Sequence, residues 1–239
     1  MPYPYYYGFD WTYLVLVLPC ILLSLWASSN VSSTFNKYAK QLSIRRITGA
    51  EAAQRVLAAN GVRGVRIDRV SGNLTDHFDP KTNVIRLSDN VYSSTSTAAI
   101  GVACHEAGHA VQYAVGYVPI KLRAAIIPIT NFGSKIAMPL ILIGILLSAL
   151  GNVSYTFVYL GIAAFSLSLV FQLVTLPVEF NASRRAMQAI EDTGLLTQEE
   201  QKGAKQTLKA AAMTYVAATA VALSQLVRLL VIFGRRRRD

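Results

Sequence analysis

Long runs without charged residues constrain this chain more than any other feature of its sequence. A helix needs about 20 apolar residues to cross the hydrocarbon core of a bilayer. Three runs approach this length, near Trp11 to Ser29, Ile136 to Gly151 and Tyr155 to Pro177. A fourth run, near Ala210 to Phe233, is a weaker candidate because it is rich in alanine and contains Gln225 and Arg228. The sequence therefore predicts a mainly α, multi-pass membrane protein.

Composition and charge agree with this class. The chain is 53% hydrophobic and only 15% charged, and its formal net charge is +10. In a membrane protein such an excess of basic residues more often contacts anionic lipid headgroups than nucleic acid. We therefore expect a lipid bilayer as partner and no nucleic acid. The two cysteines, Cys20 and Cys104, provide no disulfide framework.

The polar stretch between the first and second runs has the signals of a small α+β region. Thr48 to Glu51 is a capping-box pattern, which predicts the start of a short helix that Asn60-Gly61 would end. Val65 to Val70 alternates as a strand does, and Val84 to Leu87 predicts a second short strand after a turn. A region of this size buries little core alone, so we expect it to pack against the helices.

An H-E-x-x-H motif, His105-Glu106-Ala107-Gly108-His109, stands between this region and the second run. It contains two of the three histidines in the chain. Histidines four residues apart lie on one face of a helix, so His105 and His109 can bind one zinc ion. Glu106 would then act as general base towards the water at the metal. The alternative is a pair of core histidines beside a chance glutamate, which is costly in an apolar stretch.

The helix that carries the motif is expected to begin at Ser94, Thr95 or Ser96, each of which is a suitable N-cap. It should run through about residues 95–116. A later segment rich in helix formers should break at Gly194 and restart near Thr197.

A catalytic zinc site needs a third protein ligand, and Glu179 is the stronger of two candidates. It ends the third apolar run, where an unpaired carboxylate would be costly. A hairpin of the second and third runs, joined near Asn152, would return Glu179 to the side of the motif. Otherwise Glu179 is an interfacial acid paired with Arg184 or Arg185. The other candidate ligand is His77, which is most simply a loop or turn residue and otherwise could contact the substrate or hydrogen-bond a metal ligand.

Supporting roles can be assigned to several further residues. Ser183, one turn after Glu179, could hydrogen-bond a metal ligand. The donor that stabilises developing charge on the substrate remains open between His77, Arg123 and Tyr113. The strand at Val84 to Leu87 could bind an extended substrate along its edge.

Four stretches of the chain together resemble a known family: TDHFDP, the following NVIRLS, HEAGHAVQ and PVEFNASRRA. They are similar to those of the bacterial YugP-like membrane-bound neutral zinc metallopeptidases, over nearly the whole chain. The resemblance implies a membrane metalloprotease with His105, His109 and Glu179 as zinc ligands and Glu106 as base. More distantly, the segment from Glu179 resembles the E-x-x-A-D segment of other membrane zinc proteases, although Ser183 stands where those have Asp.

These inferences give one division of the chain, with a small zincin-like catalytic region inside a helical membrane protein. We expect a tail (1–10), a spanning helix (11–29), the catalytic region (30–135), a spanning hairpin (136–177), a segment with the third ligand (178–209), an apolar helix that spans or associates with the membrane (210–233) and a basic tail (234–239). The substrate would be a protein or peptide, most simply one associated with the cell membrane. The sequence sets no oligomeric state.

Two other functions compete with membrane-bound proteolysis. If Ala98 to Val118 spanned the bilayer, the protein would be an intramembrane protease. A zinc-stabilised adaptor without turnover is the other possibility, although a structural site needs no base such as Glu106 and normally has four protein ligands. The positive-inside rule places the site in the cytoplasm, because six basic residues flank span ends on the side of the motif. Four spans would, however, leave Arg235 to Arg238 outside, against the same rule.

Overall fold

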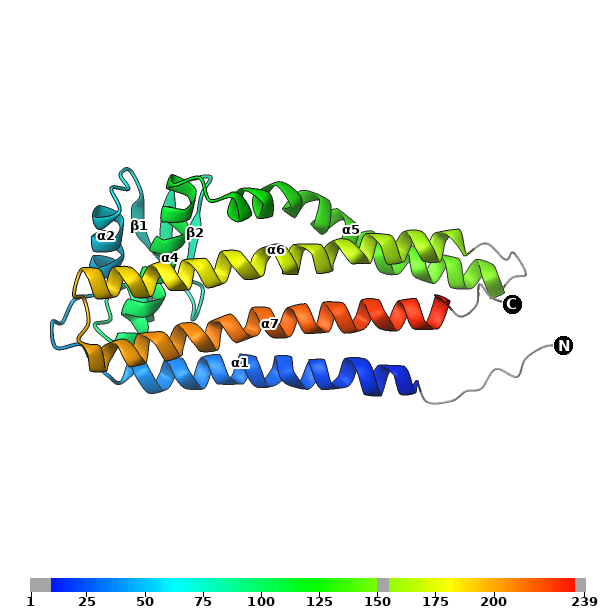
Figure 1. Ribbon diagram of the computed structural model, residues 1–239, viewed down its shortest axis with the longest axis horizontal. Coiled ribbons are helices and arrows are strands. Elements are labelled where there is room, and N and C mark those ends of the chain that lie inside the picture. Colours follow the sequence, from blue (N-terminus) through cyan, green and yellow to red (C-terminus); the bar gives the residue numbers. More distant parts are fainter. Residues whose placement is uncertain (1–9, 150–154, 235–239) are drawn as a thin grey trace. The chain divides into compact units, whose positions relative to one another are not determined.

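The computed structural model describes residues 10–149 and 155–234 and is mainly helical (Figure 1). A short π-helical turn (Tyr13–Val17) leads into the first long helix. The helices are α1 (Leu18–Ala39), α2 (Gly49–Ala59), α3 (Asp89–Tyr92), α4 (Thr97–Ala114), α5 (Val118–Ala149), α6 (Thr156–Asp192) and α7 (Gln198–Gly234). The strands are β1 (Arg66–Val70), β2 (His77–Asp79) and β3 (Val84–Ser88). The chain forms two compact units, and α1, α5, α6 and α7 each contribute to both.

Four helices in the described part of the chain are long and apolar enough to cross a membrane, which confirms the predicted multi-pass class. They are α5, α6, α7 and the helix formed by Tyr13–Tyr38. In their most apolar windows only 11% to 28% of the residues are buried inside the protein. Large side chains such as Leu25, Leu142 and Leu173 are therefore exposed. An apolar surface of this extent is suited to lipid rather than water.

The first unit, here called the helical unit, comprises 1–26, 128–172 and 217–239. In it α5 and α6 pack closely through glycines. A Cβ atom on Gly161 would lie 2.7 Å from the carbonyl oxygen of Ala137, and one on Gly144 would lie 2.8 Å from the backbone nitrogen of Val158. Such contacts are typical of membrane helices, which associate through small residues. Arg228, the charge that weakened the fourth run as a candidate, binds Asp10.

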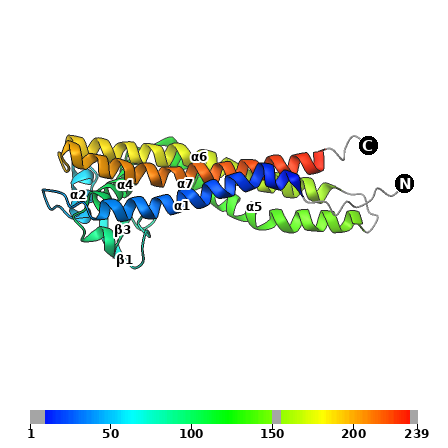
Figure 2. The same cartoon turned by 90° about the horizontal axis from the view of Figure 1, so that it is seen from below.

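The second unit, here called the mixed unit, comprises 27–127 and 173–216 and contains the sheet. Helix α4 is its centre: 14 of its 18 residues are buried, and α2 packs against it (Figure 2). The main hydrophobic core joins residues of α2, β3, α4, α6 and α7, among them Val56, Leu87, Ile100, Ile190 and Leu208. Glycines again allow close approach, since a Cβ on Gly101 of α4 would lie 3.1 Å from Ala204 of α7.

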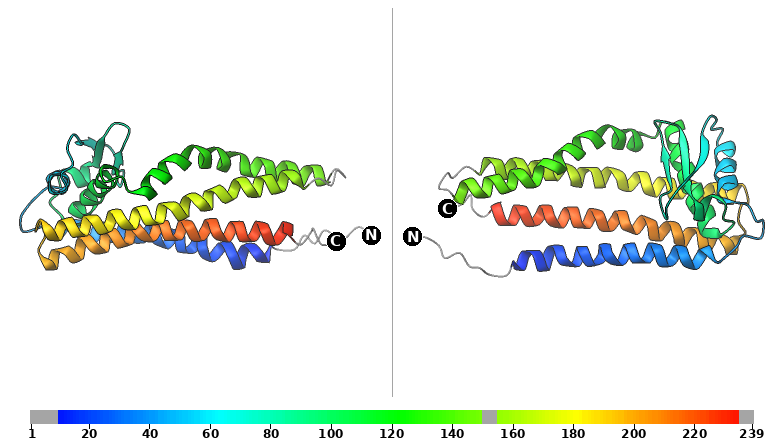
Figure 3. Two further views of the ribbon diagram at one scale, coloured as in Figure 1. Left: turned by 45° about the horizontal axis from the view of Figure 1, so that its top comes forward. Right: turned by 180° about the vertical axis from the view of Figure 1, so that it is seen from behind.

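The sheet has three strands in the order β1-β3-β2, with β1 parallel and β2 antiparallel to β3 (Figure 3). The strand predicted at Val84 to Leu87 is therefore the central one. The prediction that it binds substrate along a free edge is wrong, because its hydrogen-bonding groups already pair on both sides. The sequence does not indicate β2, which pairs with the second edge of β3, because β2 is only three residues long and follows a turn-rich segment. Of the two outer strands, β2 is in contact with α4.

Most local signals in the mixed unit correspond to real boundaries. Thr48 caps α2 in a full capping box with Glu51, and Asn60 ends that helix. Ser96 is the N-cap of α4, whose end is followed by Gly116 at a φ of 68°. The positive φ of Gly116 and of Gly194 explains why the chain turns after α4 and after α6, since glycine adopts this region without strain.

Some boundaries differ from the expected ones. Helix α1 continues through the polar residues after Ser29 as far as Ala39, and the hydroxyl of Ser33 donates to the carbonyl oxygen of Asn30 in the preceding turn. Helix α6 runs without interruption from the third apolar run past Glu179 to Asp192. The expected hairpin turn near Asn152, residues 1–9 of the predicted N-terminal tail and residues 235–239 of the predicted basic tail lie outside the described residues.

We predict that Gly49→Ala destabilises the mixed unit. The new Cβ would lie 2.3 Å from the backbone oxygen of Val91, and a backbone atom cannot move aside by changing a rotamer. Overpacking of this kind costs about 1–3 kcal/mol in the free energy of unfolding. Thermal unfolding of the detergent-solubilised protein should show a lower melting temperature for this variant. Gly234→Ala is the matched control, because nothing lies within 4 Å of its Cβ position, and equal melting temperatures for both variants would contradict the packing described here.

Candidate metal centre

The centre lies where α4 crosses α6 within the mixed unit, and a glycine permits their close approach. A Cβ atom on Gly108 would lie 2.8 Å from the carbonyl oxygen of Ala182. Any larger residue would push the helices apart. Gly108 is the fourth residue of the H-E-x-x-H motif, and Ala182 follows Glu179 by almost one turn. The contact therefore brings the motif and Glu179 face to face.

Three potential ligands converge at this crossing. The Nε2 atoms of His105 and His109 lie 3.3 Å and 3.5 Å from the same oxygen, Oε2 of Glu179. One ligand atom from each residue lies within 4.8 Å of those of the other two. In the described part of the chain this is the only group of three or more His, Cys, Asp or Glu residues with metal-binding geometry. The structure thus brings His105, His109 and Glu179 together as the sequence predicts.

The spacing of these atoms suits zinc. Ligand atoms about 2.0–2.1 Å from a tetrahedral zinc lie about 3.3–3.4 Å from one another. The two nitrogen–oxygen distances, 3.3 Å and 3.5 Å, are close to this edge length. Two imidazoles and one carboxylate are also a donor set of catalytic zinc sites, which keep a fourth position open. The three residues therefore form a possible zinc site.

Hydrogen bonds at the far side of each imidazole fix its orientation. Nδ1 of His109 lies 3.0 Å from Oε1 of Gln112, and Nε2 of Gln112 donates to the carbonyl oxygen of Val178 and to Asn181. The amide of Gln112 is thereby held with its oxygen towards His109, and an amide oxygen only accepts. Nδ1 of His109 must therefore carry the proton, which leaves the lone pair on Nε2. Ser183 Oγ lies 3.1 Å from Nδ1 of His105 and takes the corresponding place there.

Glu179 is held by Arg123, at the start of α5. Arg123 donates to Oε1 of Glu179 at 2.7 Å, so that Oε2 is the oxygen that faces the two histidines. The alternative pairing of Glu179 with Arg184 or Arg185 is not the one observed. Arg184 is exposed, and Arg185 donates to Asn181 instead. Arg123 is thus the ion-pair partner of Glu179. The sequence does not indicate this pairing.

Glu106 is buried beside the crossing. Burial is the main cause that raises its pKa to about 7, while His105 opposes the shift and the carboxylates of Glu179 and Asp76 add to it. The backbone of Phe78 in β2 also hydrogen-bonds to this carboxylate. A carboxylate with these neighbours can exchange a proton near neutral pH.

Two residues proposed from the sequence, His77 and Tyr113, are not part of the three-ligand group. His77 is exposed at the start of β2, and its Nδ1 lies 2.8 Å from the carbonyl oxygen of Thr75. Tyr113 packs edge-on against Phe78, with ring centroids 5.7 Å apart.

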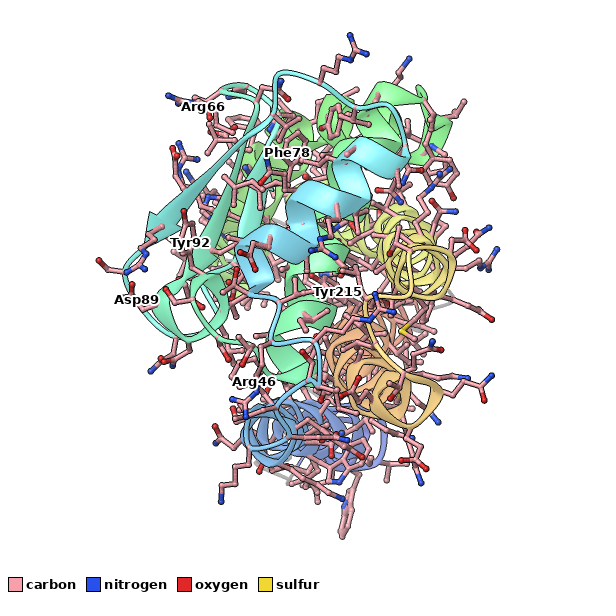
Figure 4. All side chains as sticks on the ribbon, turned by 90° about the vertical axis from the view of Figure 1, so that its left-hand side faces the viewer. Arg46, Arg66, Phe78, Asp89, Tyr92 and Tyr215 are labelled. Carbon is pink, nitrogen blue, oxygen red and sulfur yellow. The ribbon has the colours of Figure 1, made fainter. Side chains whose placement is uncertain are left out.

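A cavity of about 410 Å³ opens onto the centre. Some of the residues that line it are not indicated as site residues by the sequence. Asp76 and Tyr215 line it together with His105, Glu106 and Glu179. The carboxylate of Asp76 accepts hydrogen bonds from the backbone and hydroxyl of Ser88, which ties the loop before β2 to the end of β3. Tyr215 comes from α7 and lies in the interior between helices in Figure 4. Gln112 could have been found, because it follows His109 by three residues on a helix, whereas no pattern marks Tyr215 within an apolar run.

Comparisons with known proteins identify the family of the chain. Residues 13–234 match a family described as "Putative neutral zinc metallopeptidase". The chain belongs to this family. It is also 45% identical over 221 residues to "Putative membrane protease YugP" of Bacillus subtilis (strain 168), covering 92% of this chain and 96% of that relative. No solved structure matches it. The predicted resemblance is confirmed, and the protein is a zinc-dependent membrane hydrolase by family.

We predict that the hydrogen bonds behind the imidazoles tighten zinc binding. Gln112→Ala and Ser183→Ala should each weaken zinc affinity about 10- to 100-fold, the range found when such supporting partners are removed. Competition with a chelator of known affinity measures this directly. Ser183→Asp is the matched control, because its carboxylate also accepts a hydrogen bond from Nδ1 and should keep the affinity. Unchanged affinity in both alanine variants would contradict the orienting role.

Proposed function

We propose that the protein is a zinc metalloendopeptidase in which His105, His109 and Glu179 bind the metal and Glu106 is the general base. The observation that carries the proposal is the convergence of two imidazole nitrogens on one carboxylate oxygen, at 3.3 Å and 3.5 Å. The family supports the reaction class, and the relative named as a membrane protease supports a peptide substrate.

The chemistry follows from the positions of the side chains. When bound, zinc supplies a Lewis acid that polarises the scissile carbonyl group and lowers the pKa of a coordinated water towards ~7. Glu106 accepts a proton from the attacking water and passes it to the nitrogen of the leaving amine. Gln112 keeps the lone pair of His109 directed at the metal position. Arg123 keeps one oxygen of Glu179 occupied, which leaves the other for the metal.

Tyr215 is the best-placed donor to the oxygen of the substrate carbonyl. Its side chain lines the cavity beside Glu106 and hydrogen-bonds to Glu179, so it reaches the immediate surroundings of the metal position. None of the three donors considered from the sequence, His77, Tyr113 and Arg123, is among the residues that line this cavity. A phenolic hydroxyl within this cavity can hydrogen-bond the oxygen as negative charge develops there.

The same geometry bears on the two alternative functions. Helix α4 is buried in the mixed unit and is not one of the four candidate spanning helices in the described chain. This favours a protease with its site beside the membrane segments over one whose motif helix crosses the bilayer. A buried Glu106 next to a three-ligand group favours an enzyme over an adaptor, because a structural zinc site needs neither a base nor an open position.

We further propose that the site faces the cytoplasm. Basic residues flank the span ends on the side of the mixed unit, among them Lys37, Lys40, Arg45, Arg46, Arg184 and Arg185. Lysine and arginine residues near the ends of spanning helices tend to stay in the cytoplasm, and this bias sets the orientation of a membrane protein. With four spanning helices both ends of the chain lie on the opposite side, so Arg235 to Arg238 would be an exception to the rule.

We predict that Glu106→Gln abolishes peptide hydrolysis and leaves zinc bound. The amide has nearly the shape of the carboxylate but cannot accept the proton. Loss of general base catalysis typically lowers the rate of hydrolysis by a factor of the order of 10²–10⁴. The measurements are cleavage of a quenched fluorescent peptide library and zinc content by mass spectrometry. Glu191→Gln, an exposed acid near the end of the same helix as Glu179, is the control. Turnover by the Glu106→Gln variant at the rate of wild type would refute the mechanism.

We predict a cytoplasmic location for the turn before β3. In a background without Cys20 and Cys104, Lys81→Cys should react with a membrane-impermeant thiol reagent only after the cells are permeabilised. Trp11→Cys, at the start of the first helix, should react in intact cells, because both side chains are exposed. Labelling of Lys81→Cys in intact cells would place the site on the outer side.

A further inference from the structure

The cavity at the metal centre has a wall that comes from the N-terminal helix. Four residues of α1 line it, at spacings of three and four that place them on one helix face: Ser28, Val31, Ser32 and Phe35. By sequence alone this helix is a membrane anchor. In the structure its C-terminal half belongs to the mixed unit, and Phe35 is part of the main hydrophobic core.

Helix α7 provides more of the lining, and its residues there are mostly small or apolar. They include Leu208, Ala211 and Ala212. Val102 of α4, in the turn before His105, adds a further apolar surface. The volume of about 410 Å³ lies within the range of roughly 300–1,000 Å³ that is typical of binding sites for small ligands. The cavity therefore has room for a substrate side chain next to the metal centre.

The charges of the lining decide which side chain would be accepted. Asp76, Glu106 and Glu179 are acidic, and the lining, all of it described in the structure, contains neither lysine nor arginine. Besides His105 and Tyr215, the rest of the wall consists of apolar side chains and short hydroxyl side chains. Burying an acidic substrate side chain there would be costly, because it would lose its hydration and meet three carboxylates. A basic side chain would find the carboxylate of Glu179 already paired with Arg123. An apolar side chain would gain from leaving water.

We propose that this face of α1 is one wall of a substrate subsite that receives an apolar side chain next to the scissile bond. The proposal rests on the proposed peptidase function and adds a substrate class, polypeptides with an apolar residue at the cleavage point. Helix α1 then has two roles, because it anchors the chain in the membrane and also selects the substrate. Segments of membrane proteins at the bilayer surface have the required composition.

Neighbouring serines on α1 provide a matched pair of variants. Ser32 lines the cavity and Ser33, the next residue, does not. Both are exposed, and both hydroxyls bond only to carbonyls of their own helix, those of Ser28 and Asn30. Replacing either serine by Phe therefore removes no tertiary hydrogen bond. Ser32→Phe narrows the cavity, whereas Ser33→Phe points about 100° away around the helix.

The test measures binding to the zinc-loaded, full-length protein in detergent. The probes are fluorescein-labelled peptidyl hydroxamates, whose hydroxamate binds zinc and whose adjacent residue is Leu, Ala or Asp. We expect wild type to bind the Leu probe at least about tenfold more tightly than the Asp probe, as measured by fluorescence anisotropy. Ser32→Phe should lose at least about tenfold in affinity for the Leu probe and less for the smaller Ala probe. Ser33→Phe should bind all three probes as wild type does.

The possible failures are distinguishable. If wild type retains zinc and binds the Leu and Asp probes equally, or if the two Phe variants behave alike, the subsite is overturned and the peptidase function stands. If zinc-loaded wild type binds none of the hydroxamates, the proposed active site fails and the subsite fails with it. Because binding requires no turnover, slow cleavage of unsuitable peptides does not affect the result.

Discussion

The close approach of α4 and α6 at Gly108 is the contact on which the rest of the site depends. With no side chain at this position, the backbone of α4 reaches the carbonyl oxygen of Ala182. Only at that separation can imidazoles on one helix and a carboxylate on the other come within 3.3–3.5 Å of each other. Packing in the mixed unit holds the crossing in place, because the hydrophobic core includes Ala103 and Ala107 of α4 and Ala186 and Ile190 of α6.

Two of the three ligands, His109 and Glu179, are each held from behind by a group that can only accept or only donate. Gln112 forces the tautomer of His109 because its own amide nitrogen is already bonded to α6. Arg123 engages one oxygen of Glu179 and so selects the other. A buried carboxylate between two imidazoles would otherwise be costly, and these partners stabilise it before any metal binds. The arrangement is therefore pre-organised for a cation of the size and coordination of zinc.

The sequence predicts correctly those features that depend on interactions between residues close together in the chain. Three signals depend only on residues within one or two helical turns: the capping box at Thr48 and Glu51, the N-cap Ser96 and the H-E-x-x-H spacing. The structure has α2 beginning directly after Thr48 and α4 directly after Ser96. Glu179 was found because a carboxylate at the end of an apolar run needs a partner. Arg123, Asp76 and Tyr215 were missed or misplaced because their positions depend on how separate elements pack. The central place of β3 was missed for the same reason, since strand order depends on tertiary contacts.

The central claim is that one zinc ion is bound by two imidazoles and one carboxylate from α4 and α6. X-ray absorption spectroscopy of the zinc-loaded protein tests it most directly. The account predicts a first shell of nitrogen and oxygen at about 2.0–2.1 Å, with the outer-shell scattering of two imidazole rings and without sulfur at about 2.3 Å. A sulfur shell would implicate Cys104 or Cys20, and the scattering of one or three imidazoles would imply a different donor set. Either result would contradict the site described here.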